Sequence, residues 1–128
     1  MDWSLYPNFK KSEFVCSETK ECNMDPEFLE VLQSIRNVYD KPMVIASGFR
    51  SVKHSVEVVK PQRGEHTYGC AVDIKVHGAD ALTLIHHALT FGITRIGVSQ
   101  KGDMDKRFIH LGMGDSFHHG FPPGIWSY

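Results

Sequence analysis

The stretch from Gly64 to Ile74 reads Gly-Glu-His-Thr-Tyr-Gly-Cys-Ala-Val-Asp-Ile, and it restricts the fold more than any other part of the chain. Its second half, from Cys70 onward, alternates in the way that is typical of a β-strand. Small and apolar residues surround Asp73, and an unpaired carboxylate is costly to bury, so this side chain needs a metal ion or a strong donor beside it. We therefore expect a loop carrying His66, a tight passage at Gly69, and a strand that presents Asp73 back toward the histidine.

Imidazole nitrogen and carboxylate oxygen are ligands that zinc accepts, so His66 and Asp73 are candidate metal ligands. A catalytic zinc ion needs a third protein ligand and an open position. Our third candidate is His110, in a short apolar strand-like run where its side chain would face away from those of its neighbours. A core histidine satisfied by hydrogen bonds is the other interpretation of this residue. His118 and His119 are the rival ligands, in a glycine-rich segment that offers less rigid positioning.

Two helices are expected. The first begins with Asp25 as its cap and Pro26 at its first position, and it ends at Asp40. The second runs over residues 78–91, with Gly92 as its stop. Residues expected on the buried faces recur at helical spacing: Phe28, Leu32, Ile35 and Tyr39 in the first helix, and Leu82, Ile85 and Leu89 in the second.

Four short apolar runs are expected to be strands: 43–46, 70–74, 93–98 and 107–111. The first of them is expected to be buried. The last two flank a turn rich in Gly and Asp and predict a hairpin. Residues 51–63 are expected to form a loop over the site, and the residues after 111 an irregular tail anchored by Phe117, Phe121 and Trp126. The chain of 128 residues suits one hydrophobic core, so we expect a single domain, residues 1–128, of the α+β class. In this fold two helices pack on a small, mainly antiparallel sheet.

The charge balance argues against several classes of partner. The formal net charge is −1, which provides no basic field for nucleic acid or for an anionic membrane surface. No apolar run approaches the roughly 20 residues of a membrane helix. The first residues lack the basic and apolar regions of a signal peptide, so we expect a protein made in the cytoplasm. We also expect a monomer. The three cysteines are expected to be free thiols.

Three motifs in this order carry a resemblance to a known family. They are Ser47-Gly48-Phe49-Arg50, the His-x-x-Gly-x-Ala-x-Asp pattern of residues 66–73, and Phe108-Ile109-His110-Leu111. Together they resemble the M15-type zinc D-Ala-D-Ala carboxypeptidases and L-alanyl-D-glutamate endopeptidases, which have the hedgehog/DD-peptidase fold. The segments 8–14 and 125–128 are similar to those of the short phage-encoded members, so the resemblance covers essentially the whole chain.

The resemblance implies Zn²⁺ held by His66, Asp73 and His110, with water in the fourth position, and hydrolysis of peptide bonds in peptidoglycan stem peptides. It also implies that Arg50 grips a carboxylate or carbonyl of the substrate, while Ser47 supports the same loop rather than acting as a nucleophile. Such a protein would reach the cell wall through a holin, in a virion or at lysis. Cleavage of a terminal D-Ala and cleavage within the stem both remain open.

The chain departs from the family where a catalytic acid or base is expected. Many relatives carry an acid where this chain has Arg107, others an aspartate in place of Gly112, and a serine often stands in place of Gly64. Asp105, the nearest acid preceding His110, is our first candidate for the general base. The remaining candidates are the acids Asp103, Asp115, Glu65 and Glu57, and the histidine His54. Glu65 adjoins a ligand, but neighbours on an extended chain point apart.

These departures motivate two other hypotheses. The first is a non-catalytic wall-binding or virion structural module that retains zinc and the fold. The second is a zinc-stabilised domain in which His54 or His118 completes a closed set of four ligands.

Overall fold

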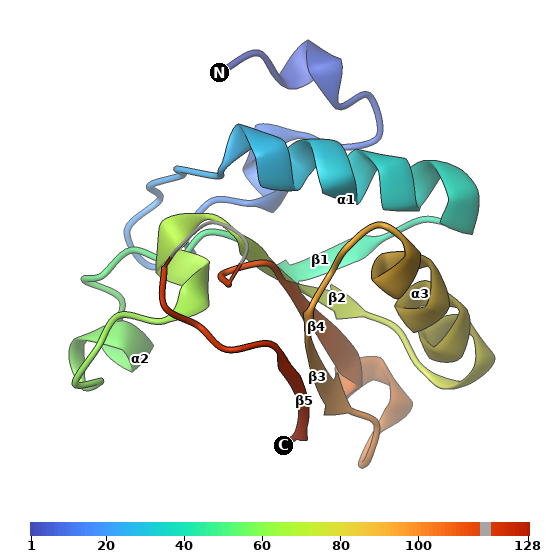
Figure 1. Ribbon diagram of the computed structural model, residues 1–128. Helices are drawn as coiled ribbons and strands as arrows, with labels where there is room; N and C mark the ends of the chain where they lie inside the picture. Colours follow the sequence, from blue (N-terminus) through green and yellow to red (C-terminus); the bar gives the residue numbers. More distant parts are fainter. Residues whose placement is uncertain (116–118) are drawn as a thin grey trace.

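A five-stranded sheet forms the centre of the molecule (Figure 1). Its strands are β1 (Val44–Ser47), β2 (Ala71–Lys75), β3 (Arg95–Ser99), β4 (Phe108–Gly112) and β5 (Gly124–Ser127), in the order β1-β2-β4-β3-β5. Neighbouring strands are antiparallel except β3 and β5, which are parallel. The computed structural model describes residues 1–115 and 119–128. The predicted α+β class with a mainly antiparallel sheet is confirmed.

The predicted hairpin is formed by β3 and β4, and its connection contains a short 3₁₀ turn over Met104–Lys106. Pairing of β4 with β2 places His110 directly opposite Asp73, and pairing with β3 places Gly97 on the other side of His110. The centre of the sheet therefore brings two of the candidate ligands side by side.

The first helix, α1 (Pro26–Tyr39), begins and ends where the sequence predicts. The side chain of Asp25 accepts hydrogen bonds from the amides of Glu27 (2.8 Å) and Phe28 (3.3 Å), and the chain leaves the helix at Asp40 with a left-handed φ of 53°. The expected stripe of Phe28, Leu32, Ile35 and Tyr39 is buried.

The second long helix, α3 (Gly78–Thr90), begins where expected and ends one residue early. Of the three residues predicted on its buried face, only Ile85 packs against the core. Leu82 and Leu89 are 73% and 57% exposed, while Ala81, Leu84 and Ala88 are buried. The last three positions also recur at helical spacing, so periodicity alone does not choose between the two faces. The small alanine side chains permit close packing of α3 against α1 and β4.

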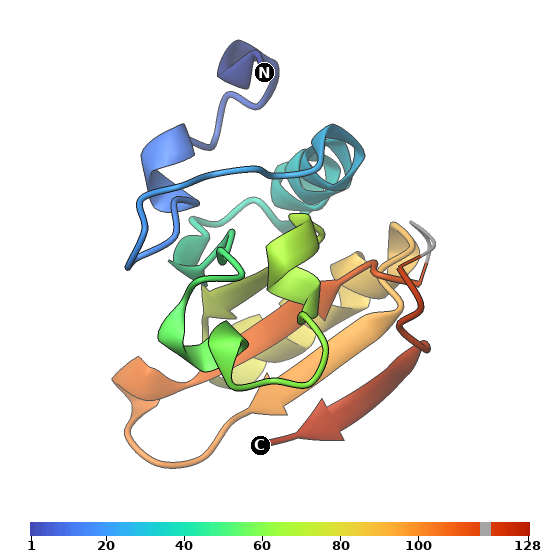
Figure 2. The same cartoon turned by 90° about the vertical axis from the view of Figure 1, so that its left-hand side faces the viewer.

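Two helical segments and the sheet form layers. Helix α3 lies on one face of the sheet, and the segment that carries the short helix α2 (Ser55–Val58) and the 3₁₀ turn Glu65–Tyr68 lies on the other (Figures 1 and 2). The region 51–63, predicted as a loop, thus includes one short helix. Among the described residues, no helix is long and apolar enough to cross a membrane.

Three further expectations need correction or completion. The run 43–46 is not a fully buried strand, because β1 lies at the edge of the sheet and Val44 is 55% exposed. The tail is not wholly irregular, since β5 pairs with β3 and brings Trp126 against Gly97. The expected anchor Phe117 lies outside the described residues. The three cysteines are free thiols, as expected.

Candidate metal centre and adjoining cavity

The structure brings the three candidate metal ligands together. His66 lies in the 3₁₀ turn Glu65–Tyr68, Asp73 in β2 and His110 in β4. One ligand atom from each side chain lies within 4.8 Å of the others, and all three residues are buried. Because the turn and the two strands come from separate parts of the chain, the cluster exists only in the folded protein.

A glycine makes the passage from the turn to β2 possible. Gly69 has a left-handed φ of 70°, and its amide donates to the carbonyl of His66 (3.3 Å), which ends the turn. A Cβ at this position would overlap the carbonyl oxygen of Asn23 and lie 2.7 Å from the amide nitrogen of Asp25. The start of α1 and the turn that carries His66 therefore pack backbone against backbone.

Each of the two candidate ligand histidines has one ring nitrogen turned toward Asp73. Nδ1 of His66 lies 2.8 Å from the carbonyl oxygen of Gly48, and a carbonyl oxygen only accepts, so the proton is on Nδ1. Nε2 of His66 then lies 3.4 Å from Asp73 Oδ1, and Nδ1 of His110 lies 3.0 Å from the same oxygen. Two imidazole nitrogens and one carboxylate oxygen thus converge, and this donor set fits a zinc ion.

The ionisation of the cluster follows from burial and from these contacts. Burial alone would raise the pKa of Asp73, but hydrogen bonding and charge interaction with His110 and His66 hold it well below its ordinary value. Burial would lower the pKa of His110, whereas Asp73 and Glu65 raise it above its ordinary value. Asp73 is therefore a carboxylate, as a metal ligand must be.

Glu65 lies against the cluster, where the sequence did not predict it. It is 5% exposed, and its Oε1 lies 2.7 Å from Nε2 of His110. The expectation that Glu65 points away from the site is wrong, because residues 65–68 form a 3₁₀ turn and not an extended segment. The sequence contained one sign of this arrangement, the glycine at position 112. Only the register of β4 shows that this glycine leaves room for the carboxylate of Glu65.

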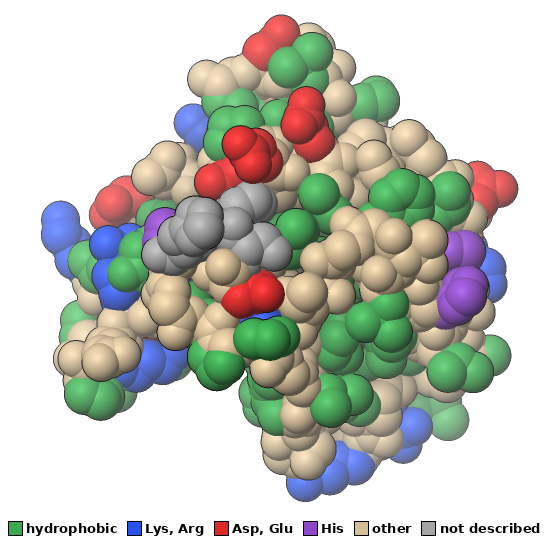
Figure 3. Space-filling view, in the orientation of Figure 1, with side chains coloured by type: hydrophobic (Ala, Val, Ile, Leu, Met, Phe, Trp, Pro, Cys, Tyr) green, Lys and Arg blue, Asp and Glu red, His purple; other side chains and the backbone are tan. Residues whose placement is uncertain are grey.

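A cavity of about 420 Å³ adjoins the three candidate ligands, and the surface is hollowed between α2 and β5 (Figure 3). Its walls combine cationic and aromatic side chains: Arg50, Lys60 and Arg95, and Phe108, Phe121, Trp126 and Tyr128. The cavity offers positive charge and flat apolar surface next to the cluster. These features suit a ligand with carboxylate or carbonyl groups on a partly apolar framework.

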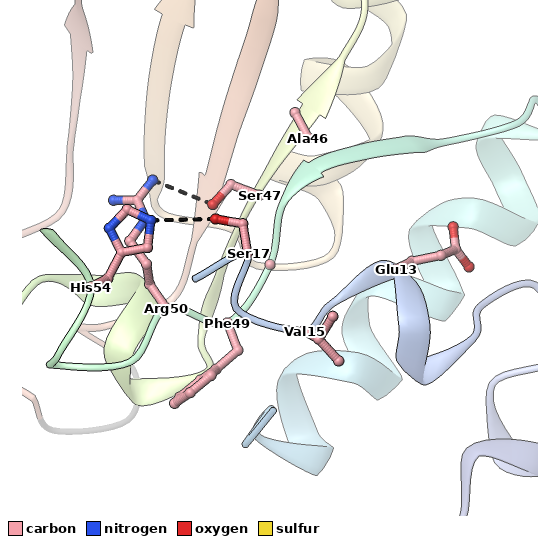
Figure 4. Close-up of a pocket in the computed structure, with 9 residues that line it drawn as sticks. Glu13, Val15, Ser17, Ala46, Ser47, Phe49, Arg50 and His54 are labelled. Carbon is pink, nitrogen blue, oxygen red and sulfur yellow. Dashed lines mark hydrogen bonds between the residues drawn. The ribbon is translucent and has the colours of Figure 1, made fainter. Parts of the chain in front are cut away.

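Arg50 lies between this cavity and a second one of about 240 Å³, which Figure 4 shows in close-up. Its Nη1 donates to Glu57 Oε2 (3.2 Å) and its Nη2 to Ser47 Oγ (3.3 Å). Ser47 thus holds the arginine, which agrees with a supporting role. Glu57 is buried and also accepts from Lys60 Nζ (2.8 Å) and from the amide of Gly64 (2.8 Å).

The other candidate bases lie apart from the cluster. Asp105 is in the exposed turn Met104–Lys106, Asp103 precedes that turn, and neither lines the cavity. Asp115 accepts a hydrogen bond from Thr94. His54 caps α2, where its Nδ1 accepts from the amide of Val56 (3.1 Å).

The rival ligand histidines are not part of the cluster either. His119 stacks on Tyr68 with the ring centroids 4.0 Å apart, and His118 lies outside the described residues. Among the described residues, the group of potential ligands at this site consists of His66, Asp73 and His110.

Comparison with known proteins adds one match. A family model described as Peptidase M15 matches residues 7–112, a range that contains α1, α3, strands β1 to β4 and the whole candidate metal centre. Comparison with curated proteins gives no match.

Proposed function

The chain belongs to the Peptidase M15 family, and on that premise we propose that it is a zinc-dependent peptidase that hydrolyses peptide bonds in the stem peptides of peptidoglycan. One observation carries the proposal: His66 Nε2, Asp73 Oδ1 and His110 Nδ1 converge beside a cavity. A structural zinc site has four protein ligands, whereas a catalytic site keeps one position open. Three candidate ligands at the wall of a cavity favour the catalytic kind.

The residues that would hold the zinc ion are His66, Asp73 and His110. When bound, zinc supplies Lewis acidity that polarises a carbonyl group and makes water a stronger acid. The carbonyl of Gly48 and the carboxylate of Glu65 keep the two imidazole rings in place.

Substrate orientation is assigned to the cavity wall. Arg50 presents a planar guanidinium, which pairs well with a carboxylate or a carbonyl group, and Ser47 and Glu57 restrict its rotation. The aromatic side chains Trp126 and Tyr128 line the same cavity, and their apolar surface would reduce the access of water to a bound peptide. Stem peptides carry free and side-chain carboxylates, so they match this chemistry. The proposal includes removal of a terminal D-Ala and cleavage within the stem.

A phage would use such an enzyme for lysis of its host or for local opening of the wall during infection. The enzyme would then act at the cell wall, carried there by another component or released at lysis.

A second candidate function is a zinc-containing module that binds wall peptide without cleaving it. It is favoured because each carboxylate of the cavity is already engaged. Among the described lining residues these carboxylates are Asp73 and Glu65. The first is a candidate metal ligand, and the second is occupied by His110, Arg95 and the amide of Gly114. No carboxylate in the described lining is therefore free to accept a proton from water.

Incubation with purified peptidoglycan tests the two functions. We expect protein purified without added metal to contain about one equivalent of zinc and to release fragments that mass spectrometry identifies as shortened stem peptides. Removal of the metal should abolish release, and added zinc should restore it. A protein that holds zinc and sediments with the wall, but releases no fragment from any wall preparation, would establish the binding module instead.

A further inference from the structure

The carboxylate of Glu65 is held by three groups. Oε1 lies 2.7 Å from His110 Nε2, while Oε2 accepts from the amide of Gly114 (2.8 Å) and lies 3.0 Å from Arg95 Nε. The N–H at Arg95 Nε does not point at any acceptor among the described residues, so this last contact is an ion pair and not a hydrogen bond.

The ring of His110 stands between Glu65 and the other candidate ligands. Its Nε2 faces Glu65, and its Nδ1 faces Asp73 at 3.0 Å. These two nitrogens point to opposite sides of an imidazole ring. Glu65 therefore acts on the cluster through His110 and does not itself join the ligands.

The space for this carboxylate exists because position 112 has no side chain. Residues 110 and 112 lie on the same face of β4, since side chains alternate along a strand. A Cβ on Gly112 would overlap the carboxylate of Glu65. The glycine and the glutamate, which are distant in the sequence, thus form one structural unit beside His110.

We propose that Glu65 is the positioning residue of His110: it accepts the Nε2 proton, so that the Nδ1 lone pair is directed toward a zinc ion shared with His66 and Asp73. The inference rests on the proposed zinc site and adds the residue that selects the tautomer of its third ligand. A carboxylate that accepts a proton from a ligand histidine orients the ring and increases its basicity. Arg95 and the amide of Gly114 hold Glu65 in turn.

Zinc affinity, measured by competition with a chromogenic chelator, tests this role without any peptidase assay. We expect Glu65→Ala to weaken zinc binding by about 10- to 100-fold. Glu65→Gln should weaken it less, because its amide oxygen still accepts the Nε2 proton. Gly112→Ala should act in the same direction as Glu65→Ala, since the added methyl group displaces the carboxylate. Gly124→Ala is the matched control, because a Cβ there meets nothing within 4 Å.

A second measurement reads the tautomer directly. Nitrogen-15 spectra of the metal-free protein, at a pH where His110 is neutral, should show the proton on Nε2 in the wild type and a mixture of tautomers in Glu65→Ala. The inference is overturned if the wild-type proton is on Nδ1, or if Glu65→Ala lowers the melting temperature but binds zinc as tightly as the wild type. A wild type that binds zinc and never cleaves wall would refute the peptidase and leave this role of Glu65 intact.

Discussion

At the scale of single residues, Arg50 in the cavity wall is held by hydrogen bonds, whereas Asp105, the candidate base chosen from the sequence, lies on an exposed turn. Arg50 is 20% exposed at its side chain and is tied to Glu57 and Ser47, whereas Asp105 is exposed in the turn Met104–Lys106. A restrained side chain loses little entropy when it binds a ligand, and an exposed one has to become ordered first.

Replacement of Arg50 should impair the hydrolysis of substrate more than it impairs folding. In Arg50→Ala, Glu57 keeps its contacts with Lys60 and with the amide of Gly64, so we expect the melting temperature and the zinc content to change little. A hydrogen bond to a charged group contributes about 1.5–3 kcal/mol, so activity on stem peptides should fall by roughly 10- to 100-fold. Arg50→Lys should also lose activity, because an ammonium group lacks the planar fork. A large fall in melting temperature would show that the ion pair with Glu57 is chiefly structural.

The assignment of Asp105 as general base stays a proposal. If this carboxylate accepts the proton from water, the turn Met104–Lys106 has to close toward the cavity once substrate binds, as catalytic contacts often tighten only in the complex. Asp105→Asn should then lower hydrolysis by about 10²- to 10⁴-fold at unchanged zinc content. Asp103→Asn is the matched control on the same connection. Full activity of the Asp105 variant would remove this residue from the mechanism while the zinc peptidase remains.

At the scale of elements, the segment between β1 and the 3₁₀ turn Glu65–Tyr68 is organised around Glu57. This residue of α2 accepts hydrogen bonds from Arg50, Lys60 and the amide of Gly64, which join the beginning and the end of the segment. The contacts hold the segment on the face of the sheet opposite α3 (Figure 2). In this segment a buried carboxylate holds the chain in place, as apolar packing does in the rest of the protein.

Glu57 should make stability depend on pH in a defined window. Burial would raise the pKa of its carboxyl, but Lys60, Gly64 and Arg50 lower it below the ordinary value of 4.5. Because the folded pKa is the lower one, the stabilising effect is complete above the unfolded pKa and is lost as the pH falls through the folded pKa. We expect Glu57→Gln to melt below the wild type at neutral pH, with the difference shrinking as the pH falls below 4.5. The exposed Glu30→Gln is the control, and a difference that does not change with pH would contradict the prediction.

At the scale of the whole molecule, the candidate metal centre joins parts of the chain that are far apart in sequence. A candidate ligand comes from each of three elements: the 3₁₀ turn Glu65–Tyr68, β2 and β4. Strand β5 adds Trp126 beside His110, with the ring centroids 5.1 Å apart. Because the unfolded chain does not hold these side chains together, a zinc ion bound at the cluster stabilises only the folded state.

Removal of zinc should therefore lower thermal stability. At a free zinc concentration about 1,000 times the dissociation constant, linkage adds about 4 kcal/mol, which corresponds to a rise in melting temperature of roughly 10–20 °C for a chain of this size. Scanning calorimetry with zinc and with a chelator measures the shift. Asp73→Ala, which loses one candidate ligand, should show almost none of it. Equal melting temperatures with and without zinc would mean that the cluster does not bind the metal.

Local signals in the sequence were sufficient for the two long helices and the hairpin, and they named the three candidate ligands that the fold brings together. The cap at Asp25 and Pro26 acts within one turn of the helix, so it is readable without any knowledge of the fold. Likewise, the glycine at position 69 is required by a backbone conformation that only a few residue types adopt. The order of the motifs around His66 and His110 then indicated the family.

Only the tertiary structure decided which side chains meet. Two faces of α3 have helical periodicity, and packing against α1 and β4 selects the one with Ala81 and Ala88. The strand β5 depends on pairing with β3, because its own residues are mostly exposed and carry little pattern. The direction of Glu65 follows from a 3₁₀ turn and from the space above Gly112, and both depend on the register of β4. These features are contacts between distant segments, whose free energy appears only when the sheet has formed.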